Sequence, residues 1–327
     1  MEYNIRFTLD YELKKDFTEL IKYHKDSDYF NITDEELRKK YKSRLDNIKN
    51  GEKIGDTGMN FLEIPARKVV VTTNKEYDIK CPLCLNPQVD KTIYPYNLEK
   101  LILWRGYLIK PNTFPYFKLH YLIQSSDHIE GTDRGTQNET HRDPNVIEDM
   151  LLFAKTMNSG SILFNGWVGN SLGHLHFHYT DTHFPIKRKL KDYSLDKEVI
   201  ETNNRSKICI YKDENHNCKN FILIKGVNPG TDLFKLLQHI DSLKLFYNLL
   251  FYWNKNVFFI FVFIRRKEQD DFNFNFGAAH MSGLSTFSNN NLEFYKNNKN
   301  EFLRIIDNYC SKTVVKIDAD IIKKLFL

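Results

Sequence analysis

Three histidines alternate with apolar residues between positions 174 and 178, and this alternation constrains the fold more than any other feature. The run reads His174-Leu175-His176-Phe177-His178. Residues two apart in a β-strand point to the same side, so a strand would place the three imidazoles on one face and Leu175 and Phe177 on the other. Imidazole can donate, accept, bind a metal or attack at neutral pH. The run predicts a strand with one chemically active face; a chance cluster on a solvated strand edge and a metal site are the alternatives.

A short glycine-containing segment, Gly169-Asn170-Ser171, precedes the histidine run. Glycine permits tight turns that other residues resist, and successive backbone N–H groups in such a turn can bind an anion. The Ser171 hydroxyl would add another donor. The two features together predict a site that handles phosphate groups.

A second pattern with chemical meaning is Cys81-Pro82-Leu83-Cys84. A lone pair of cysteines at this spacing fits a zinc site, a redox pair or neither. A redox pair is expected near a βαβ unit, which the surrounding residues do not indicate, and zinc requires two further ligands. The spacing alone leaves the three interpretations open.

The rest of the chain alternates between strand patterns and helix patterns. One helix is expected after Asp143-Pro144, because apolar residues there recur on a single helical face: Val146, Met150, Phe153, Ala154 and Met157. A polar stretch at 187–207 resembles a linker, and a second strand–helix–strand–strand set begins near residue 220. The patterns predict an α+β fold of two similar halves, each an antiparallel sheet with flanking helices.

The same patterns divide the chain into three parts. Residues 1–60 are polar and mostly helical in pattern, with Thr33 and Glu36 spaced as a capping box, and they predict a helical N-terminal extension. Residues 61–200 form the first half, with the cysteine pair and the histidines, and residues 201–327 form the second half.

Composition limits the ligand and the cellular setting. The 327 residues carry a net charge of +5, which favours small anions such as nucleotides; the charge is dispersed, so nucleic acid is not expected as the main ligand. The longest apolar run, residues 257–264, is much shorter than the ~20 residues that span a bilayer. The first residues lack a signal-peptide layout, and five irregularly spaced cysteines form no disulfide framework. We expect a reduced, cytoplasmic protein with no membrane segment, and a homodimer stays open.

The order Asn165, Gly169-Asn170-Ser171 and His174-x-His176-x-His178 resembles the histidine-triad superfamily. It is most similar to the galactose-1-phosphate uridylyltransferase-like branch, which includes diadenosine tetraphosphate phosphorylases and GDP-hexose phosphorylases. The resemblance covers about residues 81–185 and, more thinly, 220–285. It implies that His176 forms a covalent nucleotidyl-imidazole intermediate. It also implies that Asn170 and Ser171 hold the phosphate oxygens.

The same resemblance implies one structural zinc ion. Its ligands would be Cys81, Cys84, His128 and His174. Four protein ligands close the site, so the metal would have no open catalytic position. His120 and His141 are the rival candidates for the third ligand.

Two further segments are candidates for substrate binding. The branch lines its nucleoside pocket with an N-x-x-P stretch, which implies that Asn112 binds ribose hydroxyls and that Phe114 and Tyr116 stack on the base; a proline-rich turn with core aromatics is the alternative. Arg265 and Arg266, at a predicted strand end, could clamp a second phosphate bidentately or end the strand in solvent.

Two departures from the branch bear on the activity. His178 stands where its transferases and phosphorylases carry glutamine, and Leu175 stands where uridylyltransferases carry proline, so galactose metabolism is not expected. The resemblance implies nucleotidyl transfer or phosphorolysis on a nucleotide-sugar or a dinucleoside polyphosphate, with inorganic phosphate, a sugar phosphate or water as acceptor. The alternatives are a hydrolase of the same substrates and a zinc-stabilised nucleotide-binding protein without turnover.

Overall fold

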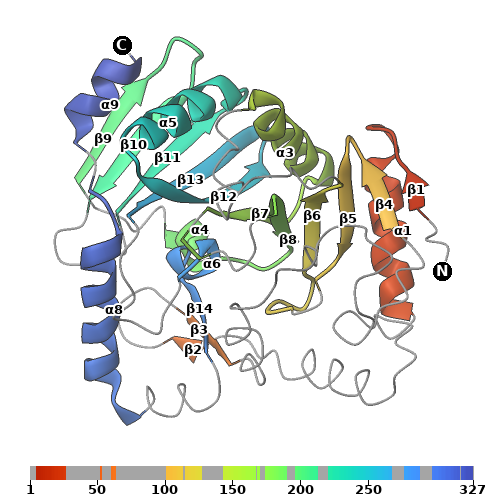
Figure 1. Ribbon diagram of the computed structural model, residues 1–327, viewed down its shortest axis with the longest axis horizontal. Coiled ribbons are helices and arrows are strands. Elements are labelled where there is room, and N and C mark those ends of the chain that lie inside the picture. Colours follow the sequence, from red (N-terminus) through yellow and green to blue (C-terminus); the bar gives the residue numbers. More distant parts are fainter. Residues whose placement is uncertain are drawn as a thin grey trace.

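The computed structural model of the chain is an α+β structure built on one large sheet, as expected (Figure 1). It describes residues 5–26, 52–53, 60–63, 101–112, 115–126, 143–166, 168–169, 174–189, 196–212, 220–266, 276–287, 297–316 and 318–326. The sheet has eleven strands in the order β1-β4-β5-β6-β8-β7-β12-β13-β11-β10-β9. All its pairings are antiparallel except that of β1 with β4.

The strands of the large sheet fall into two groups along the chain, and three other strands form a separate sheet. The first group is β1 (Ile5–Phe7), β4 (Leu101–Trp104), β5 (Tyr107–Pro111), β6 (Tyr121–Ser125), β7 (Ser161–Asn165) and β8 (His176–Thr180). The second group is β9 (Asp196–Glu201), β10 (Lys207–Lys212), β11 (Phe221–Gly226), β12 (Phe246–Asn254) and β13 (Val257–Arg265). A separate small sheet contains β2 (Glu52–Lys53), β3 (Asn60–Glu63) and β14 (Leu284–Phe287).

Helices cover both faces of the large sheet. One face is covered by α1 (Leu13–Asp26), α3 (Pro144–Met157), α5 (Gly230–Ser242) and α9 (Ala319–Phe326). The opposite face carries α4 (Pro185–Lys189), α6 (Ala278–Met281) and α8 (Lys299–Thr313). The expected helix after Asp143 is confirmed as α3. Asp143 caps it by accepting the Asn145 N–H at 2.8 Å, and Asn158 ends it in the left-handed conformation at φ 50°.

The sheet consists of two similar halves that meet where β7 pairs with β12. From the outside inward, the first half runs β4-β5-β6-β8-β7 and the second runs β9-β10-β11-β13-β12. In each half one helix, α3 or α5, connects the third strand to the innermost one. The expectation of two similar halves is therefore confirmed. The expectation of a simple linker at 187–207 is not, because β9 forms an edge strand there; its polar composition fits a strand with one neighbour.

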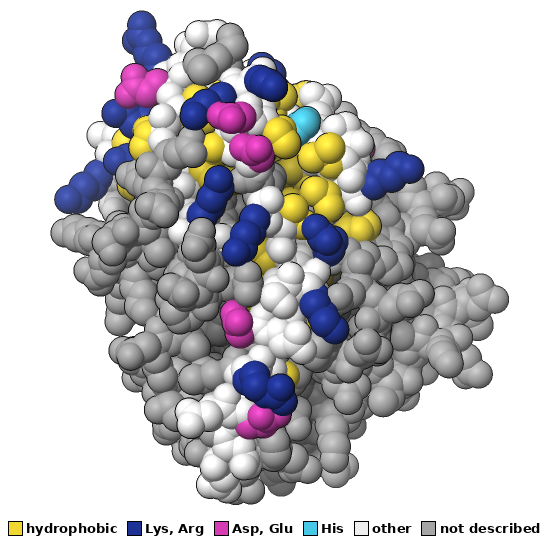
Figure 2. Space-filling view, turned by 90° about the vertical axis from the view of Figure 1, so that its left-hand side faces the viewer, with side chains coloured by type: hydrophobic (Ala, Val, Ile, Leu, Met, Phe, Trp, Pro, Cys, Tyr) yellow, Lys and Arg dark blue, Asp and Glu magenta, His cyan; other side chains and the backbone are white. Residues whose placement is uncertain are grey.

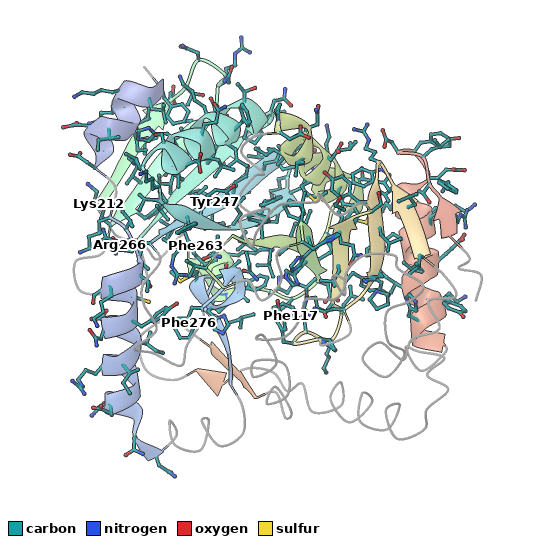
Figure 3. All side chains as sticks on the ribbon, viewed as in Figure 1. Phe117, Lys212, Tyr247, Phe263, Arg266 and Phe276 are labelled. Atoms are coloured by element: carbon teal, nitrogen blue, oxygen red, sulfur yellow. The ribbon has the colours of Figure 1, made fainter. Side chains whose placement is uncertain are left out.

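Alternation along the strands separates two cores. Tyr121, Ile123, Phe177 and Tyr179 pack under the helices of the first face. The residues between them point to the other face, where Leu163 and the aromatic residues of β13 and α8 form a second core. In Figure 3, Tyr247 lies above the sheet, and Phe117 and Phe276 lie below it.

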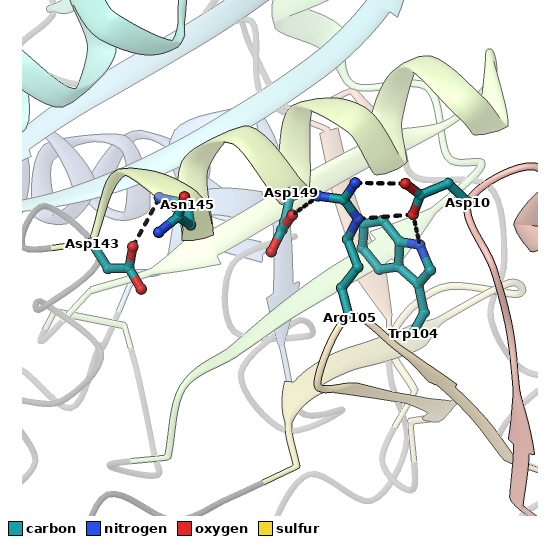
Figure 4. Close-up of polar contacts among 6 residues, drawn as sticks. All are labelled: Asp10, Trp104, Arg105, Asp143, Asn145 and Asp149. Atoms are coloured by element: carbon teal, nitrogen blue, oxygen red, sulfur yellow. Dashed lines mark hydrogen bonds and ion pairs between the residues drawn. The ribbon is translucent and has the colours of Figure 1, made fainter.

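The first residues belong to the sheet instead of extending from it. β1 adds a parallel edge strand to β4, and α1 packs on the sheet beside α3. Arg105, in the β4–β5 turn, donates to Asp10 and to Asp149 of α3, while Trp104 Nε1 donates to Asp10 at 2.9 Å (Figure 4). The helical part of the prediction holds for α1, but the N-terminal extension is not confirmed, and the capping box at Thr33 and Glu36 lies outside the described residues.

Figure 2 shows Lys and Arg side chains scattered over its face, interrupted by acidic and hydrophobic ones. None of the described helices is long and apolar enough to cross a membrane. Cys209 is a buried free thiol, but Cys310 is disulfide-bonded, so the expectation of a fully reduced chain does not hold at that residue.

Candidate active site

The histidines lie in the middle of the large sheet. β8 begins at His176 and runs between β6 and β7, where His176 pairs with Gln124 and His178 pairs with Leu122 and Leu163. His176 and His178 are 5% and 6% exposed, and His174, just ahead of the strand, is 2% exposed. The interpretation as a solvated strand edge is therefore wrong, because the imidazoles lie on an interior strand and face the second core.

His176 is oriented by a backbone carbonyl. Its Nδ1 lies 2.7 Å from the carbonyl oxygen of His174, which can only accept, so Nδ1 carries the hydrogen. In the neutral ring Nε2 then carries the lone pair. Burial lowers the pKa of His176 to about 4, so the ring is neutral at pH 7. The sequence could not reveal the acceptor of the His176 Nδ1–H, because that acceptor is a backbone carbonyl.

His174 faces the end of β6. Its Nε2–H donates to the carbonyl oxygen of Ser125 at 2.7 Å, so Nδ1 is the nitrogen that could bind a metal. Ser125 precedes the predicted ligand His128 by three residues. His128, His141, Cys81 and Cys84 lie outside the described residues, and within those residues no three His, Cys, Asp or Glu side chains group as a metal site. The donor set suits zinc, and a carbonyl on the far nitrogen is the usual support for a ligating histidine.

His178 is linked to a fourth histidine that the sequence indicated only as a rival metal ligand. His120 Nε2 lies 2.9 Å from His178 Nδ1, and His120 is 4% exposed. The Tyr116 hydroxyl lies 3.4 Å from the same Nδ1. The alternation of Leu119-His120-Tyr121 was the available signal, because it placed His120 on the face opposite the buried Tyr121.

The predicted nucleoside pocket is partly within the described chain. The Asn112 amide lies 3.1 Å from His120 Nε2, and the Tyr116 ring packs edge-on against His120 with centroids 4.3 Å apart. Both residues therefore contact the histidine cluster. Tyr116 also packs on Phe117, so it is a core aromatic and a site residue at once. Phe114 lies outside the described residues.

The predicted phosphate-binding turn packs against the second half of the chain. Asn165 Oδ1 accepts the Ala278 N–H at 2.6 Å. Gly169 has φ +90°, and a Cβ there would lie 2.3 Å from the Cα of Gly277. No side chain fits there, which explains the glycine at 169; a Cβ on Gly277 would instead lie 2.6 Å from Asn165 Oδ1. Asn170 and Ser171 lie outside the described residues.

Arg265 is a buried brace, not a strand end in solvent. One guanidinium nitrogen donates to Asn248 Oδ1 at 3.0 Å and to the Phe276 carbonyl at 2.8 Å; the other donates to Tyr309 and Thr313. Asn248 in turn donates to the Val168 carbonyl at 2.7 Å, next to Gly169. Arg265 thus connects to the turn through Asn248.

Arg266, the other predicted phosphate ligand, points away from this network. It is exposed. Its backbone N–H donates to the Thr313 carbonyl at 2.9 Å, and it lies where β13 meets the end of α8 (Figure 3). The structure does not bring Arg266 together with the histidines.

Two lysines, the buried Lys110 and the half-buried Lys187, lie on the histidine face, and sequence patterns did not single them out. Lys110 shares a cross-strand row with Leu122 and His178, and its charge helps to lower the pKa of His176. Lys187 contacts Ser161 Oγ, and its Nζ lies 4.1 Å from the centre of the Tyr252 ring; burial lowers its pKa to about 7. Among the described residues, the buried carboxylates all belong to helices of the opposite face: Asp16, Asp149 and Asp232. The face is therefore suited to anions.

Only the first half carries histidines at this place. Leu163, the third residue of β7, pairs with His178. Asn248, the third residue of β12, pairs with Phe263. The structure therefore places Phe261 and Phe263 where the first half has His176 and His178, and the described chain has one histidine cluster.

Comparison with known proteins gives a likeness of fold. No protein-family model matches the chain, and no curated protein matches it. The structure of yeast Ap4A phosphorylase Apa2 in complex with AMP superposes with a TM-score of 0.50 at 13% identity, covering 88% of this chain and 91% of that one. The structure of the same yeast enzyme without AMP gives a TM-score of 0.49 at 14% identity, covering 88% and 96%. The fold implied by the resemblance to the uridylyltransferase-like branch is thereby confirmed.

Proposed function

We propose that this chain is a nucleotidyltransferase of the phosphorylase type, which carries a nucleoside monophosphate on His176 from a dinucleoside polyphosphate to a phosphate acceptor. The observation that carries the proposal is the fixed orientation of His176, with Nδ1–H on a carbonyl and the lone pair on Nε2. The shared fold supports it, because yeast Apa2 is an Ap4A phosphorylase. Ap4A is therefore the first substrate to test, and nucleotide-sugars are the second.

The proposed reaction has two displacements. Nε2 of His176 attacks the α-phosphorus: a P–N bond forms, the bond from phosphorus to the bridging oxygen breaks, and the remaining nucleotide leaves as an anion. The ring becomes positive, and its Nδ1–H on the His174 carbonyl stabilises that charge. An oxygen of the acceptor then attacks phosphorus, the P–N bond breaks, and the electron pair returns to Nε2. With Ap4A and inorganic phosphate the products are ATP and ADP.

The remaining predicted residues receive supporting roles in this proposal. Gly169, Asn170 and Ser171 hold the α-phosphate oxygens, as the turn ahead of β8 predicts. The positive charge of Lys110 lies on the same face as the histidines and stabilises the anionic substrate. Asn112, Phe114 and Tyr116 line the nucleoside pocket.

Product analysis tests the activity directly. The protein is incubated with Ap4A, and in parallel with GDP-, UDP- and ADP-sugars, with and without inorganic phosphate. We expect ATP and ADP from Ap4A only when phosphate is present. His176→Ala should lower turnover by about a thousandfold or more, as loss of a nucleophile does, with the circular dichroism spectrum unchanged. The exposed His183→Ala is the matched control and should keep its activity.

The other outcomes separate the alternatives. ATP and AMP formed without phosphate would identify the hydrolase. Nucleotide binding by wild type and His176→Ala alike, with no turnover in either, would contradict the enzyme and leave the nucleotide-binding protein.

We also propose that Cys81, Cys84, His128 and His174 hold one structural zinc ion. The observation that supports it is His174, whose Nε2–H donates to the carbonyl oxygen of Ser125 at 2.7 Å, three residues before His128. A metal there would hold the residue whose carbonyl orients His176. Metal analysis should give one zinc per chain, lost in Cys81→Ser and in His128→Ala and kept in Cys209→Ser, the buried thiol of β10. Zinc retained in the first two variants would contradict the site.

A further inference from the structure

Two neighbours contact the same ring nitrogen of His178. Its Nδ1 lies 2.9 Å from His120 Nε2 and 3.4 Å from the Tyr116 hydroxyl. The other nitrogen of His120, Nδ1, lies 3.3 Å from the backbone nitrogen of Tyr116. The three residues therefore form a chain of contacts that begins at a backbone N–H and ends at His178.

The backbone N–H of Tyr116 determines which ring nitrogens of His120 and His178 carry a hydrogen. A backbone N–H can only donate, so His120 Nδ1 accepts and, in the neutral ring, His120 Nε2 carries the hydrogen. That hydrogen points at His178 Nδ1, which must therefore accept. A neutral His178 then carries its own hydrogen on Nε2.

Two observations remove the competing arrangements. The Asn112 amide nitrogen lies 3.1 Å from Nε2 of His120 and 3.4 Å from Nδ1. An atom at nearly equal distance from both ring nitrogens lies over the face of the ring, where an N–H contacts the π electrons, so it does not compete with the in-plane contact to His178. Burial also lowers the pKa of His120 to about 3 and the pKa of His178 well below its usual value, so both rings are neutral at pH 7.

We propose that His120 is a positioning residue that holds His178 as a neutral Nε2–H tautomer, so that the site offers a hydrogen-bond donor and no general base at this position. The consequence for the acceptor, which rests on the proposed function, is that an anionic acceptor such as inorganic phosphate reacts in preference to water.

Proton balance gives the reason for this selectivity. When an oxygen of inorganic phosphate attacks the nucleotidyl phosphorus, a P–O bond forms, the P–N bond breaks and the electron pair returns to His176 Nε2; no proton has to move. When water attacks in the same way, one proton must be removed from its oxygen. His178 cannot take it, because its Nε2 already carries a hydrogen and its Nδ1 accepts the hydrogen of His120 Nε2.

Nuclear magnetic resonance tests the tautomer without any turnover. In protein labelled with ¹⁵N-histidine, the two ring nitrogens of His178 should show the shifts of an Nε2–H tautomer in the wild type. His120→Gln, which keeps a donor at the place of Nε2, should preserve that pattern. His120→Leu should convert His178 to a mixture of tautomers. An Nδ1–H tautomer in the wild type, or an unchanged pattern in His120→Leu, would overturn the proposal.

His24 provides a matched control, because it packs against β6 on the face opposite to the histidine cluster. His24 of α1 is buried to a similar degree, and its Nδ1 lies 3.0 Å from the Tyr121 hydroxyl. His24→Leu removes a similarly buried imidazole from the face that α1 covers and should leave the His178 signals unchanged. A change of the His178 pattern in this control as large as in His120→Leu would show a general packing effect and overturn the assignment to His120.

Partition between acceptors tests the consequence. At a fixed phosphate concentration, the ratio of AMP to ADP formed from Ap4A should rise at least fivefold in His120→Leu, with kcat changed more than KM, and stay near the wild-type ratio in His120→Gln. An unchanged ratio in His120→Leu overturns the acceptor selectivity. Absence of turnover in the wild type contradicts the proposed function instead, and the tautomer measurement still decides the role of His120.

Discussion

Arg265 carries its charge where the residue is 0% exposed, and within the described part of the chain it makes four hydrogen bonds, none of them to a carboxylate. Burial lowers its pKa, but its partners are all acceptors, so the guanidinium is held by dipoles. Its neighbour Arg266 is exposed, and its backbone N–H donates to the Thr313 carbonyl. Two adjacent residues of one type therefore have unrelated roles, because successive side chains of a strand point to opposite faces.

This difference predicts opposite results for two matched variants. Arg265→Met leaves several buried acceptors without donors and should lower the free energy of unfolding by about 3 kcal/mol or more. Arg266→Met should change it by less than about 0.5 kcal/mol, as exposed substitutions do. Urea unfolding followed by circular dichroism measures both. Equal effects of the two variants would contradict the role of Arg265 as a brace.

The turn between β7 and β8 depends on a close contact between two backbones. Gly169 has φ +90° and meets Gly277 of the segment before α6. Gly106, in the β4–β5 turn, has φ +78° but nothing within 4 Å of the place of its Cβ. The two glycines thus share the same backbone requirement and differ only in the space around them.

Substitution of the two glycines separates strain from contact. Gly106→Ala should cost about 1–2 kcal/mol from the positive φ alone and leave turnover of Ap4A near the wild-type value. Gly169→Ala adds a clash with backbone, which costs about 1–3 kcal/mol more, and should lower kcat because it displaces the predicted phosphate-binding residues. Unfolding curves and kcat are measured for both, and wild-type turnover in Gly169→Ala would show that this contact does not position the site.

The elements that sequence patterns predicted well are those with a strong period. The helix after Asp143, the hairpin of β12 and β13, and the strand through His176 all follow from alternation or from a helical face, and each is confirmed. The parallel edge strand β1 was missed because Ile5–Phe7 has only three residues and pairs with β4, far along the chain. Contacts of that kind leave no local pattern.

The same distinction holds within the site. The shared face of His176 and His178 was predictable because it depends on a period of two. The partners of these rings were not predictable. The acceptor for His176 is the backbone carbonyl of His174, which no side-chain pattern reveals. His120, Lys110 and Lys187 reach the same face through tertiary contacts between segments far apart in the sequence. Sequence patterns indicate which residues share an element, and tertiary contacts decide which residues share a site.

The whole molecule has two similar halves but one histidine cluster among its described residues. Phe261 and Phe263 stand in the second half where His176 and His178 stand in the first. We therefore expect one covalent nucleotide per chain. Protein mixed with Ap4A in the absence of phosphate and quenched in base, where phosphorus–nitrogen bonds of histidine persist, should gain the mass of one nucleotidyl group on the peptide that contains His176. Two groups per chain would contradict the single cluster.

The brace that runs from Val168 through Asn248 and Arg265 to Tyr309 and Thr313 links the turn ahead of β8 to α8, more than 130 residues later in the sequence. A ribosome releases the chain from its N-terminus onward, and its early parts begin to fold while the rest is still being made. The strand with His176 can form at that stage, but the support behind its turn is assembled only after α8 has been synthesised. The turn ahead of His176 thus gains this support late, and a translation product that stops before α8 lacks the brace.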